Sequence, residues 1–146
     1  MRIALGSDLS CELTTALERR LRERGFEPVP FGALAPGADE AWPNVGRSVG
    51  EAVASGDCAQ GVLCCWTGTG VSIAANKVHG VRAALCNDAE TARGARLWND
   101  ANVLALSIRS VTPAIADEIL GAWFAAQPSR EPADEKMIAD LKKMDR

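Results

Sequence analysis

Short β-rich segments alternate with helix-like segments along most of this chain, and this alternation constrains the fold more than any other feature. The β-rich segments are four to six residues long and place apolar residues in succession, a pattern typical of strands buried on both faces. We expect strands at Arg2–Leu5, Glu27–Phe31, Gly61–Trp66, Arg82–Cys86 and Val103–Ser107. We expect helices at Cys11–Arg24, Asn44–Ser55, Val71–Val78, Ala89–Trp98 and Pro113–Ala126. Regular β–α alternation predicts an α/β fold with helices on both faces of a five-stranded parallel sheet.

Local signals support these boundaries. Leu13, Leu17 and Leu21 recur at helical spacing and give the first helix an apolar face. Gly25 follows the last turn of that helix, where glycine commonly ends a helix. The segment Gly32–Pro43 is rich in Gly, Pro and Ala, so we expect a loop there.

The alternation stops after residue 127. The remaining segment begins with proline and polar residues and continues as a polar helix, Asp134–Met144. We therefore divide the chain into a domain at residues 1–127 and a tail at residues 128–146. The tail helix has little apolar face, and we expect it to dock on a partner subunit. A frayed terminus is the alternative interpretation.

Composition narrows the class of protein. A chain of 146 residues, 47% hydrophobic and 24% charged, fits one globular domain with a full core. The net charge is −3 and no dense run of Lys and Arg occurs, so nucleic acid is not an expected partner. No apolar run approaches the roughly 20 residues of a membrane span. The first residues are typical of a buried strand rather than a signal peptide.

Cysteine and histidine are too sparse for a disulfide framework or a metal centre. The five cysteines are odd in number, and Cys64 adjoins Cys65. We therefore expect free thiols and a cytoplasmic location. The one histidine, His79, does not form a zinc-type cluster with them, so no metal is expected.

Polar and glycine residues follow four of the expected strands. In open α/β sheets, ligands bind beyond the carboxyl ends of the strands, which here are followed by Gly6–Asp8, Trp66–Gly70, Asn87–Asp88 and Ser107–Arg109. The turn Trp66–Gly70 is the strongest signal, because its glycines let backbone N–H groups approach an anion and the next helix adds a favourable dipole. It matches neither the P-loop pattern nor the dinucleotide-binding fingerprint.

Cys65 stands at the edge of this turn. A thiol beside a helix N-terminus ionises more readily and can act as a base or nucleophile. Alternatively, Cys65 is a small buried residue, like Cys64 and Cys86. The residues alone leave both interpretations open.

Five blocks of sequence together carry a family resemblance. They are Gly6–Asp8, Cys65–Lys77, Arg82–Cys86, Thr91–Arg93 and Asn99–Leu104. Over residues 1–125 the chain resembles the ribose-5-phosphate isomerase type B family, which also contains the two-subunit galactose-6-phosphate isomerases. The resemblance implies a Rossmann-like three-layer α/β/α sandwich with a C-terminal helix. It also implies an obligate homodimer, which could pair into a tetramer, with sites at the subunit interface.

The resemblance further implies that an aldose phosphate and a ketose phosphate interconvert through a cis-enediolate, with no cofactor. Cys65 matches the base that moves a proton between C1 and C2, and Thr67 matches the hydroxyl that moves one between O1 and O2. Asp8 matches a carboxylate that handles sugar hydroxyls. Asn99 matches a substrate-binding amide from the partner subunit, and Arg109 a phosphate-binding arginine. The anion hole matches the backbone N–H groups over Gly68, Thr69, Gly70, Val71 and Ser72.

The sequence departs from the family pattern inside this site. Three positions that carry family histidines hold Leu9, Asn87 and Trp98. Trp42 replaces a tyrosine, and Trp66 replaces a glycine beside the base. An acidic stretch replaces the arginine-rich motif near the C-terminus, where Arg130 remains a candidate phosphate ligand. We keep Asn87, Trp66 and Arg130 as candidate substrate-binding residues.

These replacements have chemical consequences. Imidazole suits the opening of a furanose ring near neutral pH, and the remaining His79 is expected in a surface turn. Bulky indoles at Trp42, Trp66 and Trp98 predict a smaller or more apolar cavity, although each indole could instead belong to the core. The sequence therefore predicts an altered substrate, with ribose 5-phosphate as the family's usual one and an open-chain tetrulose phosphate as an attractive alternative.

Two other functions remain open at this point. The protein could be a weak or inactive family member that binds a sugar or small anion, which the lost histidines favour and the retained Cys65 and Thr67 oppose. It could also be a Rossmann-type nucleotide-binding domain. That class is disfavoured because Phe31–Ala33 follows the second strand in place of an acidic ribose ligand.

Overall fold

The structure is a computed structural model that describes residues 1–145. Within these residues the strands are β1 (Arg2–Ser7), β2 (Glu27–Gly32), β3 (Gln60–Cys65), β4 (Ala83–Leu85) and β5 (Val103–Ser107). The helices are α1 (Glu12–Glu23), α2 (Trp42–Ala54), α3 (Thr69–Asn76), α4 (Ala89–Asn99), α5 (Pro113–Ala125) and α6 (Pro132–Lys142). Every expected strand and helix is present.

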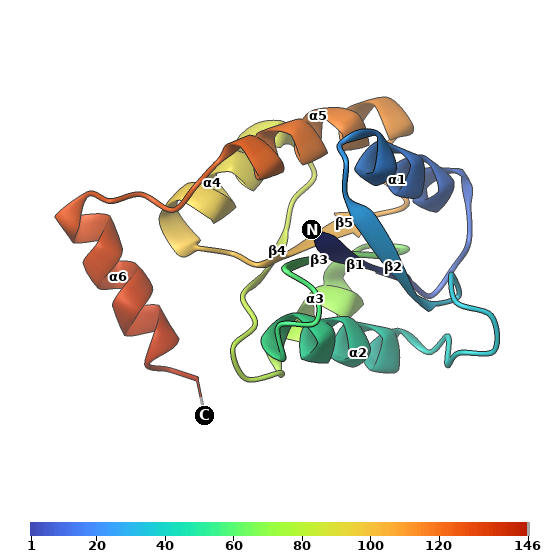
Figure 1. The fold of residues 1–146 in the computed structure, drawn as a ribbon, viewed down its shortest axis with the longest axis horizontal. Coiled ribbons are helices and arrows are strands. Elements are labelled where there is room, and N and C mark those ends of the chain that lie inside the picture. The colour runs from blue at the N-terminus through green and yellow to red at the C-terminus, as the bar shows by residue number, and fades with distance from the viewer. Residues whose placement is uncertain (146) are drawn as a thin grey trace.

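All strand pairs of the sheet are parallel, and the strand order is β2-β1-β3-β5-β4. Helices α1, α4 and α5 cover one face, and α2 and α3 cover the other (Figure 1). The predicted Rossmann-like three-layer α/β/α sandwich is therefore confirmed. From β1 the chain winds outward to β2 in one direction and to β3 in the other, which makes the β1/β3 boundary the topological switch point where such sheets bind ligands.

The two helical layers pack through different kinds of residue. On the α1/α4/α5 face, Trp123 is fully buried and donates its Nε1–H to Oε1 of Gln60 at 2.6 Å. On the opposite face, glycines bring α2 against α3. A Cβ built on Gly46 would lie 2.7 Å from the Cβ of Ala74, so only glycine permits this approach. The close α2–α3 contact fixes the position of α3, the helix that follows the glycine-rich turn.

Two helices begin two residues earlier than the sequence predicts. Helix α2 starts at Trp42, and Pro43 lies in its first turn, where its missing N–H costs nothing. Helix α3 starts at Thr69 because Gly68 adopts a left-handed conformation with φ 75° and turns the chain directly into the helix. Strand β4 is shorter than predicted and keeps only its central residues, Ala83–Leu85.

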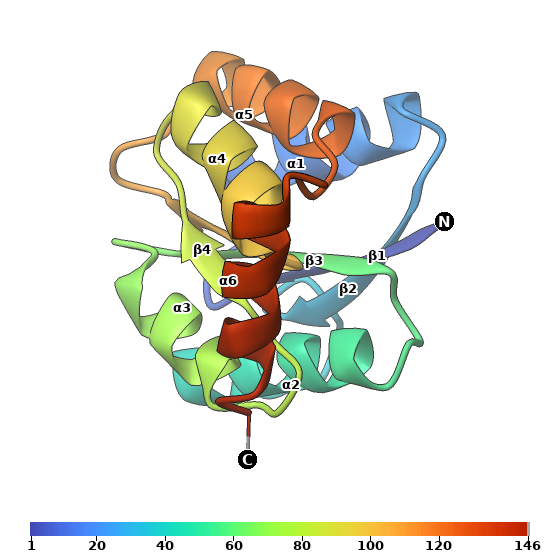
Figure 2. The ribbon, with the colours of Figure 1, turned by 90° about the vertical axis from the view of Figure 1, so that its left-hand side faces the viewer.

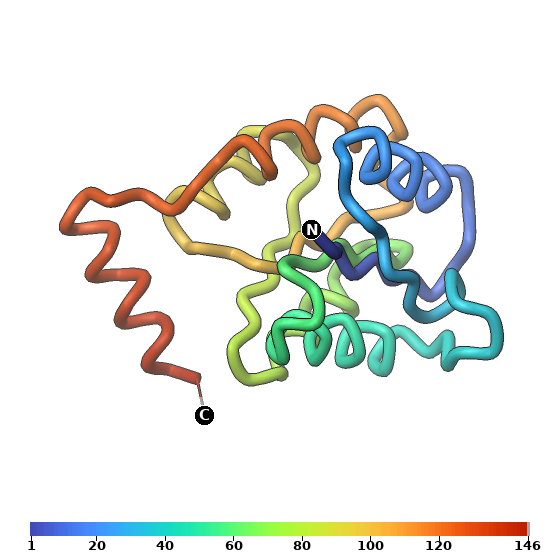
Figure 3. The backbone as a smooth tube through the Cα atoms, viewed as in Figure 1, coloured from blue at the N-terminus to red at the C-terminus, as the bar shows by residue number. Residues whose placement is uncertain are grey.

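Helix α6 stands outside the sandwich, beside the C-terminal end of α4 (Figures 2 and 3). Its Ile138 is buried, and Nζ of Lys142 lies 2.6 Å from Oδ2 of Asp100. The tail is thus an ordered helix fastened to its own chain rather than a frayed end, and docking on a partner stays a prediction. No helix within residues 1–145 has both the length and the apolar character to cross a membrane.

Candidate active site

A cavity of about 300 Å³ opens at the carboxyl ends of the strands, at the switch point between β1 and β3. Its lining comes from the end of β1, the β3–α3 turn and the start of α2, and consists of Asp8, Trp42, Cys65, Trp66, Thr67, Thr69 and Gly70. The structure therefore gathers the three predicted catalytic residues, Cys65, Thr67 and Asp8, in one place. Their chemical roles remain predictions.

The neighbouring cysteines Cys64 and Cys65 face opposite sides of the sheet, because side chains alternate along a strand. Cys64 is fully buried in the core beneath α1 and α5. Burial raises the pKa of its thiol far above the usual value, so this thiol stays protonated. Cys65 faces the α2/α3 layer, is 6% exposed and reaches the cavity. Of the two thiols, only Cys65 is placed to meet a ligand.

Gly68 sets the geometry of the turn that follows. Its φ of 75° is in the left-handed region, and a Cβ there would lie 2.5 Å from Cδ1 of Leu85 and 2.9 Å from the backbone carbonyl of Leu106. Glycine is thus required for both conformation and space. The turn brings the first amides of α3 to the cavity. Within the part of the chain that the structure describes, the N–H groups of Thr69, Gly70 and Val71 have no hydrogen-bond acceptor.

These free amides can bind an anion, because they add their own dipoles to that of the helix. The N–H of Ser72 instead donates to the carbonyl of Gly68 at 3.3 Å, so it is already satisfied. Of the residues 68–72 expected to form an anion hole, Ser72 therefore has its N–H bound within the chain, and the anion hole itself stays a prediction. Val71 contributes its amide only, because its side chain is fully buried in the core.

Two hydroxyl groups meet at the same turn. Oγ1 of Thr67 and Oγ1 of Thr69 lie 2.7 Å apart, and both side chains are exposed to the cavity. Either oxygen can be the donor. Sequence reasoning assigned Thr69 only a backbone role, and the sole available signal was the spacing of two threonines around a turn glycine.

Two indoles form walls of the cavity. The six-membered ring of Trp42 lies directly on Gly70, where a Cβ would come within 2.9 Å of Cε3. Asp39 holds the start of α2, since its carboxylate accepts from the N–H of Ala41 at 2.9 Å and from Nδ2 of Asn44 at 2.7 Å. Trp66 also lines the cavity and is 58% exposed. Both tryptophans thus line the cavity, and the smaller cavity expected from them stays a prediction.

The third tryptophan does not line this cavity. Trp98 folds back on its own helix over Gly94, where a Cβ would lie 2.8 Å from Cζ3. The guanidinium of Arg93 stacks on the indole at 5.6 Å from the ring centroid. The expectation that Trp98 adds bulk near the Cys65 pocket is therefore wrong for a single chain, because α4 ends at the opposite edge of the sheet.

Arg109 and Asn87 lie, like Cys65, at the carboxyl ends of the strands, but outside the cavity lining. The N–H of Arg109 and Oγ of Ser107 both donate to the carbonyl of Trp66, at 2.9 and 3.0 Å, which ties the end of β5 to the β3–α3 turn. The side chain of Arg109 is exposed, as is Asn87 beyond β4. Neither side chain lines the cavity, so their roles as substrate ligands stay predictions.

Asn99 and Arg130 lie on the side of the sheet where the strands have their amino ends. Asn99 is the last residue of α4 and precedes β5, so it belongs to the amino ends of the strands, whereas Cys65 is at the carboxyl end of β3. It lines a separate groove of about 410 Å³, whose lining also includes Leu141 and Met144. One chain does not bring Asn99 or Arg130 to the Cys65 cavity.

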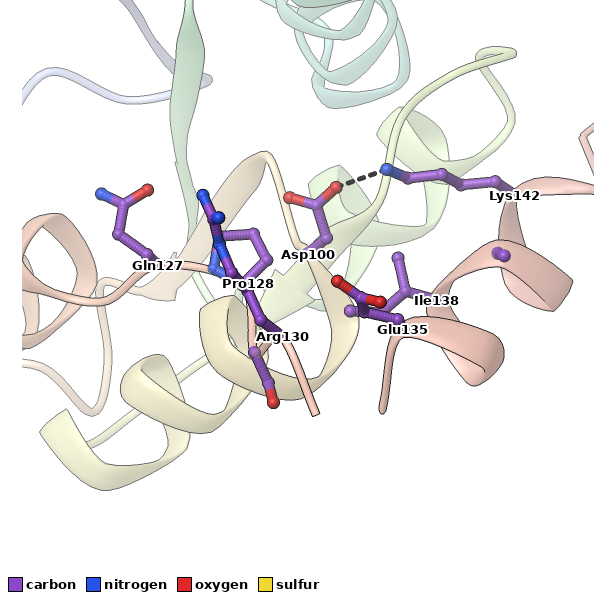
Figure 4. A pocket seen from close by; sticks show the side chains of 9 residues that line it. Asp100, Gln127, Pro128, Arg130, Glu135, Ile138 and Lys142 are labelled. Carbon is purple, nitrogen blue, oxygen red and sulfur yellow. Dashed lines mark ion pairs between the residues drawn. The ribbon is translucent and has the colours of Figure 1, made fainter. Parts of the chain in front are cut away.

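Arg130 lines a separate hollow of about 540 Å³ between the tail and α4 (Figure 4). Lys142 reaches from α6 to pair with Asp100 across this hollow. Glu135 and Ile138 line it as well. Its lining contains no cysteine and none of the free amides of α3, so the groups expected to carry proton transfer lie elsewhere.

Two asparagines in the sequence blocks that carry the family resemblance have structural roles. The carboxamide of Asn76 accepts from the N–H of Ala83 at 2.8 Å and donates to its carbonyl at 2.9 Å, like a neighbouring strand. Asn102 accepts from the N–H of Arg82 at 2.8 Å and donates to the carbonyl of Gly80 at 2.9 Å. These residues hold the edge strand β4 and the turn before it.

Comparison with known proteins now identifies the family. The sequence model described as "Ribose/Galactose Isomerase" matches residues 3–141. The chain belongs to this family of sugar-phosphate isomerases, and its enzyme class is that of the aldose–ketose isomerases.

Individual relatives share about a third of their residues with the chain. It is 36% identical over 126 residues to D-erythrulose-4-phosphate isomerase of Pectobacterium atrosepticum, covering 86% of this chain and 83% of the relative. It is 39% identical over 127 residues to ribose-5-phosphate isomerase B of Escherichia coli, covering 86% and 85%. The structure of Clostridium thermocellum ribose-5-phosphate isomerase B superposes with a TM-score of 0.89 at 36% identity, covering 99% of this chain and 97% of that one.

Proposed function

We propose that the protein interconverts a tetrulose 4-phosphate and the corresponding tetrose 4-phosphate through a cis-enediolate, in a composite site of a cytoplasmic homodimer. The observation that carries the proposal is the cavity at the switch point, which holds a thiol, a hydroxyl and free amides together at Cys65, Thr67 and the first turn of α3. The residues that line this cavity are the basis for the proposed substrate.

The proposed chemistry uses each group once. The thiolate of Cys65 removes the proton from C2 of the aldose and returns it to C1, which is general base and then general acid catalysis. The free amides of Thr69, Gly70 and Val71 stabilise the enediolate oxygen, because they point at the site before charge develops there. Thr67 carries a proton between O1 and O2, and Asp8 binds the sugar hydroxyls.

A four-carbon substrate suits this cavity. No imidazole lines it, and His79 is exposed in the segment between α3 and β4. A 4-phosphate of a tetrose cannot close a furanose ring, because the hydroxyl that would close it is esterified, so no ring-opening acid is needed. The indoles of Trp42 and Trp66 also shorten the space beside the thiol.

A purely sugar-binding role is less well supported. Binding alone requires neither a thiol nor a proton-carrying hydroxyl at the anion hole, yet Cys65 and Thr67 line the same cavity. The cytoplasmic location rests on the five cysteines, all of which are free thiols.

The homodimer is proposed from the distribution of the matched residues over two edges of the sheet. If Asn99 and Arg130 serve a site, they serve that of another subunit, because their own Cys65 lies at the opposite edge. The tail supplies an apolar surface for such a contact. Met137, Leu141 and Met144 follow helical spacing and are 70%, 38% and 71% exposed.

The substrate is tested by measuring kcat/KM for erythrulose 4-phosphate and ribose 5-phosphate with the same preparation. We expect the tetrulose to be preferred by at least tenfold, because absent acid–base help in ring opening typically costs about 10²–10⁴-fold where that step limits the rate. A ribose 5-phosphate value of about 10⁴ M⁻¹s⁻¹ or more, the low end of ordinary enzymes, with no tetrulose advantage would refute the substrate assignment.

The assembly is tested by light scattering at micromolar concentration. We expect a mass of two chains or a multiple of two, and a single-chain mass of 15.4 kDa would contradict the composite site.

A further inference from the structure

The hydroxyls of Thr67 and Thr69 form an isolated pair inside the cavity. Their oxygens are 2.7 Å apart, and neither hydroxyl has another hydrogen-bond partner among residues 1–145. Thr69 is the first residue of α3, and the preceding Gly68 has no side chain with which to cap the helix. The β-branched side chain of Thr69 has few rotamers, so its hydroxyl has a defined position beside Thr67.

A hydroxyl that carries a proton between two substrate oxygens must accept one proton while it donates another. Its oxygen gains negative charge whenever donation runs ahead of acceptance. A second hydroxyl that donates to this oxygen stabilises that charge and keeps the shuttle's own proton directed at the substrate. Thr69 is the group in contact with Oγ1 of Thr67.

We propose that Thr69 is a positioning residue whose hydroxyl donates to Oγ1 of Thr67 during proton transfer between O1 and O2. This inference rests on the proposed function of the cavity. In the step, Thr67 gives its proton to the negatively charged enediolate oxygen and takes the proton of the adjacent enediol hydroxyl. Thr69 keeps its own proton, so the substrate changes from one enediolate isomer to the other and both threonines end as they began.

The test separates proton transfer between O1 and O2 from proton transfer at carbon by Cys65. Substrate is incubated in D₂O, and deuterium at the reacting carbon of recovered substrate is compared with conversion to product. Slow transfer between O1 and O2 lets the enediolate return to substrate after exchange at Cys65. The ratio of exchange to conversion therefore reports on Thr67 and Thr69 and not on folding.

Thr69→Val removes the hydroxyl and keeps the shape. We expect kcat to fall about tenfold, in line with the loss of one hydrogen bond, and the exchange-to-conversion ratio to rise by a similar factor, with a smaller change in KM. Thr69→Ser should restore both values to within about twofold. Thr67→Val should raise the ratio further, because it removes the shuttle itself. If Thr69→Val does not fold, Thr69→Ala carries the same expectation.

Thr112→Val is the matched control, since its hydroxyl only accepts from the N–H of Ile115 at 3.2 Å at the start of α5. It should lower the melting temperature and leave the ratio unchanged. If Thr69→Val lowers exchange and conversion equally, or changes neither, Thr69 has at most a structural role and the inference is overturned. If the unaltered protein isomerises no tetrulose or pentose phosphate, the proposed function fails and the inference fails with it.

Discussion

Replacing Gly68 with alanine tests whether the glycine-rich turn is built as described. An alanine at φ 75° carries left-handed strain of about 1–2 kcal/mol. Its Cβ would also lie 2.9 Å from the backbone carbonyl of Leu106, and overpacking of this kind costs about 1–3 kcal/mol. The sum is about 2–5 kcal/mol, or a fall of about 6–20 °C in melting temperature for a chain of this size.

Gly56→Ala is the control for the conformational part. Gly56 has φ 84°, and a Cβ there would meet nothing within 4 Å. Gly56→Ala should therefore lower the free energy of unfolding by only the conformational strain of about 1–2 kcal/mol. Both variants change the unfolded chain in the same way, so their difference isolates the clash with Leu85 and Leu106.

Thermal unfolding followed by circular dichroism measures both variants, and turnover is assayed at a temperature where each is folded. Because Gly68 aims the first amides of α3, Gly68→Ala should also lose activity that Gly56→Ala retains. Equal melting temperatures for the two variants would refute the packing argument. Full activity in folded Gly68→Ala would refute the role of the turn in the anion hole.

Two further substitutions separate the roles assigned in the cavity. Cys65→Ala should lower kcat by about 10²–10⁴-fold with little change in melting temperature. Cys64→Ala should instead lower the free energy of unfolding by about 1 kcal/mol and leave turnover nearly intact. Mass mapping after iodoacetamide treatment should find Cys65 labelled and Cys64 protected, and the reverse pattern would contradict the assignment. Trp42→Ala should open the space over Gly70 and raise kcat/KM for ribose 5-phosphate relative to erythrulose 4-phosphate by about tenfold or more; an unchanged ratio would show that this indole does not select substrate length.

The fold was largely predictable because its signals are local. Uninterrupted apolar runs mark buried strands, and their alternation with helices leaves few arrangements other than a parallel sheet. The errors fall where one residue redirects the chain. A proline in the first turn lets α2 begin at Trp42, and the left-handed Gly68 starts α3 at Thr69.

The site was only partly predictable. The ends of β1 and β3 place Asp8 and Cys65 together, since neighbouring parallel strands end at the same edge. The contact of Trp42 with Gly70 depends instead on how closely α2 and α3 pack, and the pairing of Thr69 with Thr67 depends on side-chain rotamers. No periodicity or motif in the sequence indicates either contact.

A cluster of charged side chains lies at the amino ends of the strands, on the opposite side of the sheet from the cavity. The carboxylate of Asp100 faces three cations, with Lys142 at 2.6 Å, Arg82 at 3.3 Å and Arg96 at 3.7 Å.

Further carboxylates lie nearby, because Glu135 lines the hollow beside Arg130 and Asp145 lines the groove beside Asn99, so the charges at this end of the strands are of both signs. The ion pair between Lys142 and Asp100 also fastens α6, and with it the Arg130 segment, to the sandwich. The tail is thereby held on the same edge as Asn99, which is the edge that a second chain must present if the proposed site is shared.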